Sequence, residues 1–163
     1  MSVAIVTWLK STAVSHVMIE SRWLWPVCES LHFVGLALVI GAAGLFDLRL
    51  MGFLKRVPVA AAMQMRVWAA VGIVINLITG TLFFVGAPDQ YIDNPAWWGK
   101  VLFLLVAMIN IAYFETTQGS RVLMIAAEEN TPVSFKVAGA VSIASWFAVL
   151  YFGRMLPFIG NAF

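Results

Sequence analysis

The stretch that decides the fold is Trp23–Met51, which reads WLWPVCESLHFVGLALVIGAAGLFDLRLM. The run is almost wholly apolar, and its charged or imidazole side chains are Glu29, His32, Asp47 and Arg49. A helix needs about 20 apolar residues to cross the hydrocarbon core of a lipid bilayer. The run is therefore long enough to be a transmembrane helix.

Three further apolar stretches of similar length follow, at residues 67–85, 97–117 and 137–158, with short polar connections between them. Of the 163 residues 62% are hydrophobic and 11% are charged, and the mean hydropathy is +0.92. Soluble domains carry about 25% charged residues. Because a bilayer admits only helices and closed barrels, and no alternating strand pattern is present, we predict an all-α bundle of four transmembrane helices in one membrane domain, residues 1–163.

Residues 1–21 differ from the four stretches because apolar and polar side chains alternate along them. Val6, Leu9 and Met18 are interspersed with Lys10 and Glu20. The pattern predicts an amphipathic helix that lies along the membrane interface, and the alternative is an extra helix within the bundle. The segment lacks the basic start and the cleavage site of a signal peptide, so we expect it to be part of the mature protein.

The distribution of basic residues predicts the orientation in the membrane. The side that holds the first and third connections carries Arg49, Lys55, Arg56, Arg66, Arg121 and Lys136. The opposite side carries Lys10, Arg22, Lys100 and Arg154, with Asp89 and Asp93 in its only loop. The positive-inside rule places the first side in the cytoplasm. We therefore expect a multi-pass protein of the bacterial inner membrane with both termini in the periplasm.

Polar side chains inside the apolar stretches are the candidate functional residues, because such groups are costly in lipid. Glu29 and His32 are three residues apart, so they share one face of the first helix. His32 lies roughly 13 Å along that helix from its outer end. Gly35 follows on the same helix, and Lys100 and Arg154 lie on other helices at the same membrane depth. One layer in the outer half of the bundle should then hold a carboxylate, an imidazole and two cations.

Haem b is the first ligand that suits this layer. His32 would be an axial ligand, Gly35 would make room for the macrocycle, and Lys100 and Arg154 would pair with the propionates. The candidates for the second axial ligand are His16, Met155, Met18 and the His32 of a second subunit.

Two other ligands suit the same residues. A quinone could bind in an apolar slot where His32 and Glu29 handle protons. A copper site could use His32, Cys28 and a methionine, which are soft ligands suited to Cu(I). The alternative to all three is structural: Glu29 and His32 fix helix packing by hydrogen bonds, and Lys100 and Arg154 extend to the lipid phosphates.

Polar residues near the predicted cytoplasmic boundary suggest interhelical contacts. We expect Asp47 to pair with Arg66, or Arg49 with Glu115, and Asn110 to bond to a neighbouring helix. Other classes of site are excluded by composition. A single cysteine rules out an internal disulfide framework, and a net charge of +2 without a basic run gives no indication of nucleic-acid binding.

Several spaced residues carry a family resemblance. They are Ile19-Glu20-Ser21, Trp25-Pro26, Glu29, His32, Gly35, Asp47 to Gly52, Asn94 to Lys100, Asn110, Ser145-Trp146 and Gly153-Arg154. This pattern resembles a widespread family of uncharacterised bacterial four-helix membrane proteins, and a looser likeness is to copper-resistance-D proteins and cytochrome b561-like bundles. The resemblance implies the four-helix fold and singles out Glu29, His32, Lys100 and Arg154. Members of that family often carry a histidine where Glu115 stands, and His16 does not match a family position.

The prediction from the sequence is a membrane redox subunit. It binds haem b or a quinone in the periplasmic half of the bilayer and relays electrons to or from a partner. The alternatives are a non-catalytic accessory or anchor subunit of a larger membrane complex, and a transporter of copper or a small solute. With so little mass outside the bilayer, the protein is expected to work as a homo-oligomer or within a larger complex.

Overall fold

The computed structural model describes residues 2–122, 124–125 and 129–160, and these residues form helices without a strand. In chain order the helices are α1 (Ser2–Lys10), α2 (Ala13–Glu20), α3 (Leu24–Leu50), α4 (Val59–Gln64), α5 (Arg66–Gly86), the short 3-10 helix η1 (Pro88–Gln90), α6 (Pro95–Val122) and α7 (Val133–Met155). The all-α fold class is confirmed.

Four helical segments are long and apolar enough to cross a membrane: Leu24–Leu50, Val59–Gly86, Pro95–Val122 and Val133–Met155. Their number agrees with the prediction, but the bounds differ, by one residue at each end of the first segment and by more in the other three. The second segment begins earlier because α4 precedes α5. The third continues past residue 117, and there the hydroxyls of Thr116 and Thr117 donate to backbone carbonyls one turn earlier.

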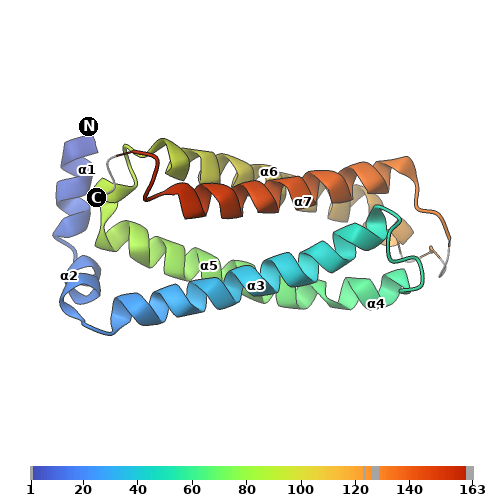
Figure 1. The fold of residues 1–163 in the computed structure, drawn as a ribbon, viewed down its shortest axis with the longest axis horizontal. Helices are drawn as coiled ribbons and strands as arrows, with labels where there is room; N and C mark the ends of the chain where they lie inside the picture. Colours follow the sequence, from blue (N-terminus) through green and yellow to red (C-terminus); the bar gives the residue numbers. More distant parts are fainter. Residues whose placement is uncertain (1, 123, 126–128, 161–163) are drawn as a thin grey trace.

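The long helices form two layers (Figure 1). α3 packs along α5, α6 packs along α7, and α3 also contacts α7. Within the described chain the backbones of α5 and α6 come close to each other at very few positions. The bundle is consequently looser along the α5–α6 side than along its other sides.

A close backbone approach holds α3 against α5. A Cβ atom added to Gly72 would lie 2.6 Å from the carbonyl oxygen of Gly35, and one added to Gly35 would lie 3.0 Å from that of Gly72. Helices come this near only where both side chains are absent. Gly35, which the sequence analysis placed beside a macrocycle, is therefore a helix-packing residue.

Local sequence explains where α3 ends and where α6 begins. Gly52 has a φ of 89°, and the amides of Gly52 and Phe53 donate to the carbonyls of Arg49 and Leu48, which makes a Schellman motif. At the start of α6 the Asn94 carboxamide oxygen accepts from the amide of Ala96, and its nitrogen donates to the carbonyl of Leu156. Asn94 thus joins the beginning of α6 to the end of α7.

The N-terminal segment is two short helices and not the single predicted one. Thr12 interrupts the helix and caps α2, because its hydroxyl accepts from the amide of Ser15. Both helices lie across the end of the bundle that carries η1 (Figure 1), and α2 packs against α5. Met18 is buried there, and Lys10 pairs with Asp89 at 3.0 Å. Leu9 and Met18 are buried, and the exposed side chains of the two helices mix Lys10 and Glu20 with Trp8, Val17 and Ile19, so the amphipathic character stays a prediction.

Candidate functional site

The long helices enclose a cleft of about 1120 Å³ toward the end of the bundle that carries η1. Its walls come from α3, α5, α6 and α7, and the loop around Tyr91 lies at its outer end. Glu29, His32, Lys100 and Arg154 all line it. The four residues that the sequence analysis placed in one layer therefore share one cavity.

His32 is held in one orientation by α5. Its Nδ1 lies 2.7 Å from the hydroxyl of Thr79, and that hydroxyl lies 2.7 Å from the carbonyl oxygen of Ile75. The single hydroxyl hydrogen is directed at the carbonyl, so Thr79 accepts the hydrogen bond from Nδ1–H. The neutral imidazole then keeps the lone pair of Nε2 for a ligand or a proton. The Phe83 ring packs at 5.7 Å, and Gly80 leaves space beside the imidazole.

Lys100 is a cation without a counter-ion in the described part of the chain. Its ammonium lies beside Gly153 of α7, 3.6 Å from where a Cβ would stand, and it is close enough to His32 for electrostatic interaction. Arg154 lies nearby in sequence with its guanidinium 5.3 Å from the ring of Phe158. A half-buried ammonium that faces a cavity attracts a ligand with a negative or strongly polar oxygen.

The outer end of the cleft carries a carboxylate and a phenol. Burial, and after it the charge of Glu29, raises the pKa of Tyr91 from 10.0 to about 12. The phenol therefore remains a neutral hydrogen-bond donor throughout the physiological range. The sequence analysis did not single out Tyr91, since a loop tyrosine gives no indication of its neighbours.

Aromatic rings form much of the remaining wall. Trp25 contacts Phe83 at 5.0 Å, and Phe84 stacks on Trp97 at 5.0 Å with an interplanar angle of 15°. Trp146, which sequence reasoning did not assign to this site, also lines the cleft, and its indole N–H has no acceptor among the described residues. The walls thus suit a flat, partly apolar ligand with polar edges.

Two predicted site residues lie elsewhere. Gly35 faces Asn76 and Gly72 at the α3–α5 contact and does not line the cleft. His16 is exposed on α2, and its nearest charged partner is Glu20 at 3.8 Å. The sequence alone could not exclude either residue as a ligand-binding one, because it does not show which way a side chain points from its helix.

The donors for a metal are few in this cleft. Among the described residues that line it, His32 is the only histidine, and neither a cysteine nor a methionine is present. Cys28 is buried outside it. No group of three or more His, Cys, Asp or Glu side chains that could hold a metal ion occurs in the described chain.

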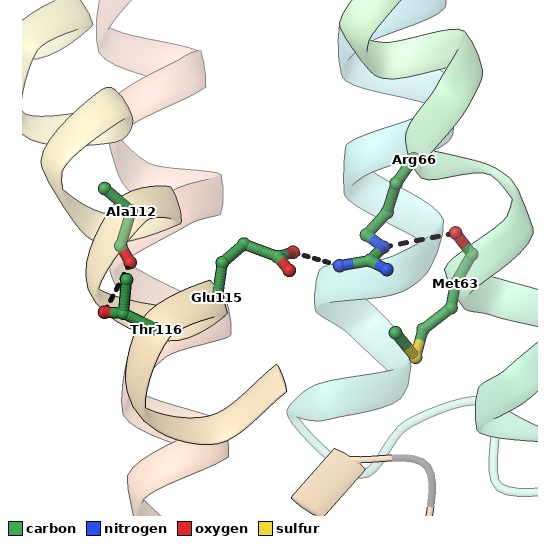
Figure 2. Close-up of polar contacts among 5 residues, drawn as sticks. All are labelled: Met63, Arg66, Ala112, Glu115 and Thr116. Carbon is green, nitrogen blue, oxygen red and sulfur yellow. Dashed lines mark hydrogen bonds and ion pairs between the residues drawn. The ribbon is translucent and has the colours of Figure 1, made fainter. Parts of the chain in front are cut away.

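Interhelical contacts at the opposite end differ from the expected pairs. Arg66 of α5 pairs with Glu115 of α6, and the Arg66 Nε also donates to the carbonyl of Met63 (Figure 2). The expected Asp47–Arg66 and Arg49–Glu115 pairs are therefore wrong. Asn110 donates to the carbonyl of Ala138 on α7 at 3.0 Å, as the prediction of a bond to a neighbouring helix requires.

Comparison with protein families shows that residues 23–159 match a family of unknown function, DUF6644. The chain belongs to this family. The DUF6644 match spans the four long helices and every cleft residue discussed above, and it leaves out α1 and α2 with His16. The resemblance to an uncharacterised family is thus confirmed. Comparison with curated proteins and with solved structures gave no match.

Proposed function

We propose that this DUF6644 protein is a redox subunit of the bacterial inner membrane that binds a quinone in the cleft. The cleft would lie in the periplasmic half of the bilayer, with both termini on the periplasmic side. The observation that carries the proposal is the pairing, in one aromatic cavity, of an oriented imidazole with an ammonium that has no counter-ion among the described residues.

Quinone chemistry needs groups of this kind at the two carbonyl oxygens. A quinol that becomes a quinone releases two electrons and two protons. The Nε2 of His32 would accept one hydroxyl proton, the Glu29 carboxylate would accept the other, and Lys100 would stabilise negative charge on an oxygen during the transfer. The two electrons would pass singly to a one-electron redox centre of a partner protein on the periplasmic side.

The size and surroundings of the cleft support a lipid-soluble ligand. Its volume of about 1120 Å³ exceeds the 300–1,000 Å³ typical of small-molecule sites, so a ring and the first part of an isoprenoid tail would fit. The separation of α5 from α6 within the described chain offers a route from the lipid.

The donor set favours quinone over the two metal-based alternatives. A haem with two histidine ligands, or with a histidine and a methionine, would need its second ligand from another subunit, because His32 is the only histidine and no methionine lines the described cleft. A Cu(I) site would need a cysteine or methionine beside His32. The quinone hypothesis uses only groups that line the cleft.

The proposal is tested by quinone titration of the purified protein in lipid nanodiscs. Trp25 and Trp97 line the cleft, so a bound quinone should quench tryptophan fluorescence saturably. We expect His32→Ala and Lys100→Met each to raise the Kd at least tenfold, which is about 1.4 kcal/mol. His16→Ala and Lys55→Met, which change the same residue types outside the cleft, should leave the Kd unchanged.

Two outcomes would refute the proposal. Quenching that rises linearly and equally in all variants would indicate quinone dissolved in the lipid, and would favour an accessory or anchor subunit. A Soret band with α and β bands after dithionite reduction, abolished by His32→Ala, would establish haem b at this site instead.

A further inference from the structure

A second cavity, of about 440 Å³, lies in the other half of the bundle. It is lined by Asp47 of α3, Asn110 of α6, Ser142 of α7, and the Arg66–Glu115 pair that joins α5 to α6 (Figure 2). The proposed quinone chemistry uses none of these polar groups, and the contacts that Asn110 and the Arg66–Glu115 pair make between helices do not account for Asp47.

Asp47 is the unusual member of this set. The residue is 4% exposed, and its Oδ2 has no hydrogen-bond partner within the described residues. Ser142 of α7 lines the same cavity as the carboxyl group. A buried carboxylate that lacks a full set of partners is costly in a low-dielectric interior, so a native structure requires a group that satisfies it.

The charged side chains around Asp47 that the structure describes do not supply a counter-ion. Arg66 on α5 and Glu115 on α6 neutralise each other as an ion pair. α7 presents the neutral Ser142, and Arg49, two residues along α3, directs its Nε to a carbonyl of the loop that follows. The side chains that line the cavity therefore carry one net negative charge when Asp47 is ionised.

Two neutral side chains that line the cavity with Asp47 carry oxygen atoms that can coordinate a cation. Asn110 donates its amide nitrogen to the carbonyl of Ala138, which leaves its side-chain oxygen to accept or to coordinate. Ser142 adds a hydroxyl oxygen from α7. Oxygen donors with one carboxylate suit a hard cation of single charge, since divalent ions usually take more carboxylates.

We propose that this cavity is a site for one monovalent cation, a sodium ion or a proton, held on Asp47 with Asn110 and Ser142 as neutral partners. An apolar layer separates it from the quinone cleft. Val39, Ala107 and Trp146 form part of that layer, and Ile73 lines both cavities. The site is therefore distinct from the cleft, and the proposal does not depend on quinone binding.

The test measures the apparent Tm of the nanodisc-embedded protein while choline chloride is replaced by sodium chloride at constant ionic strength. A sodium site predicts a saturable rise in Tm that is lost in Asp47→Asn and weakened in Ser142→Ala. Asp93→Asn, which removes an exposed carboxylate from the outer loop, is the matched control and should behave as the wild type.

A proton site predicts a different pair of results. The Tm would not respond to sodium, and infrared spectra at neutral pH would contain a protonated carboxyl band that Asp47→Asn removes and Asp93→Asn retains. Should Asp47→Asn fail to fold, the sodium response of the wild type and of Ser142→Ala still decides the first case, and an Asp47→Glu shift of the carboxyl band decides the second.

Absence of both results would overturn the proposal, since Asp47 would then be an ionised carboxylate without a bound cation. Asp47→Asn should leave quinone quenching unchanged in every case. Failure of this proposal is thereby distinguishable from failure of the quinone hypothesis.

Discussion

Replacement of Gly72 by alanine should separate α3 from α5 and destabilise the bundle. The added Cβ would lie 2.6 Å from the carbonyl oxygen of Gly35 and 2.9 Å from the Val39 side chain. Non-bonded carbon contacts are favourable only at about 3.5–4.0 Å, so the two backbones must move apart by several tenths of an ångström. Overpacking of this kind costs about 1–3 kcal/mol. A backbone neighbour cannot rotate away, so we expect roughly 2–3 kcal/mol for Gly72→Ala.

Gly35→Ala should be milder than Gly72→Ala. Its closest neighbour would be the side-chain nitrogen of Asn76 at 2.5 Å, which can move if it gives up its hydrogen bond to the Gly72 carbonyl. Gly41 is the matched control on the same helix, because a Cβ there would meet nothing within 4 Å. Alanine is favoured over glycine in helices by about 1 kcal/mol, so Gly41→Ala should be neutral or stabilising.

The assay is thermal unfolding of the three variants in detergent, followed by tryptophan fluorescence. At about 2–4 °C per kcal/mol for a chain of this length, Gly72→Ala should lower the apparent Tm by roughly 4–12 °C. Gly35→Ala should lie between Gly72→Ala and the wild type. Equal Tm values for Gly72→Ala and Gly41→Ala would refute the close α3–α5 contact.

Three further outcomes are expected. The Tyr91 phenol should titrate near pH 12, measured as the difference between the ultraviolet titration curves of the wild type and Tyr91→Phe. Because this pKa lies above the ordinary 10.0, the stabilisation of the fold linked to the neutral phenol is fully present below about pH 10 and is lost as the pH rises through 12. A double-mutant cycle on Arg66 and Glu115, whose side chains are 35% and 43% exposed, should give a coupling of only about 0.5–1 kcal/mol; a value near zero would mean that the pair does not join α5 to α6. Thr79→Val removes the acceptor for the His32 ring, so it should weaken quinone binding several-fold without unfolding the protein, and an unchanged Kd would argue against this orientation.

Much of the fold followed from the sequence because bilayer length and hydropathy constrain transmembrane helices strongly. The layer of Glu29, His32, Lys100 and Arg154 was also predictable, since helical rise sets the membrane depth of each residue once the spans are known. The ends of the helices were harder to predict. The apolar run of the third stretch ends at residue 117, but α6 continues through residues 118–122. A helix can extend beyond its apolar residues because its backbone hydrogen bonds do not depend on the hydropathy of the side chains.

Side-chain direction around each helix was the information that the sequence lacked. Gly35 and His32 are three residues apart and both contact α5, yet only His32 also lines the cleft. The pairing of Arg66 with Glu115 instead of Asp47 depends on how α5 and α6 face each other across the bundle. His16 was predicted as a ligand only because it is the second histidine of the chain, and its place on an exposed face of α2 could not be inferred from composition.

The central claim is that the cleft lined by His32 and Lys100 holds a quinone head group, and photoaffinity labelling tests it most directly. The nanodisc-embedded protein would be irradiated with an azidoquinone, with and without excess unlabelled quinone, and the labelled peptides mapped by mass spectrometry. We predict competed labelling on the cleft-facing parts of α3 and α6, at residues 25–40 and 97–104, and its loss in His32→Ala. Labelling spread over the outward faces of all four long helices, insensitive to competitor and to His32→Ala, would contradict the account.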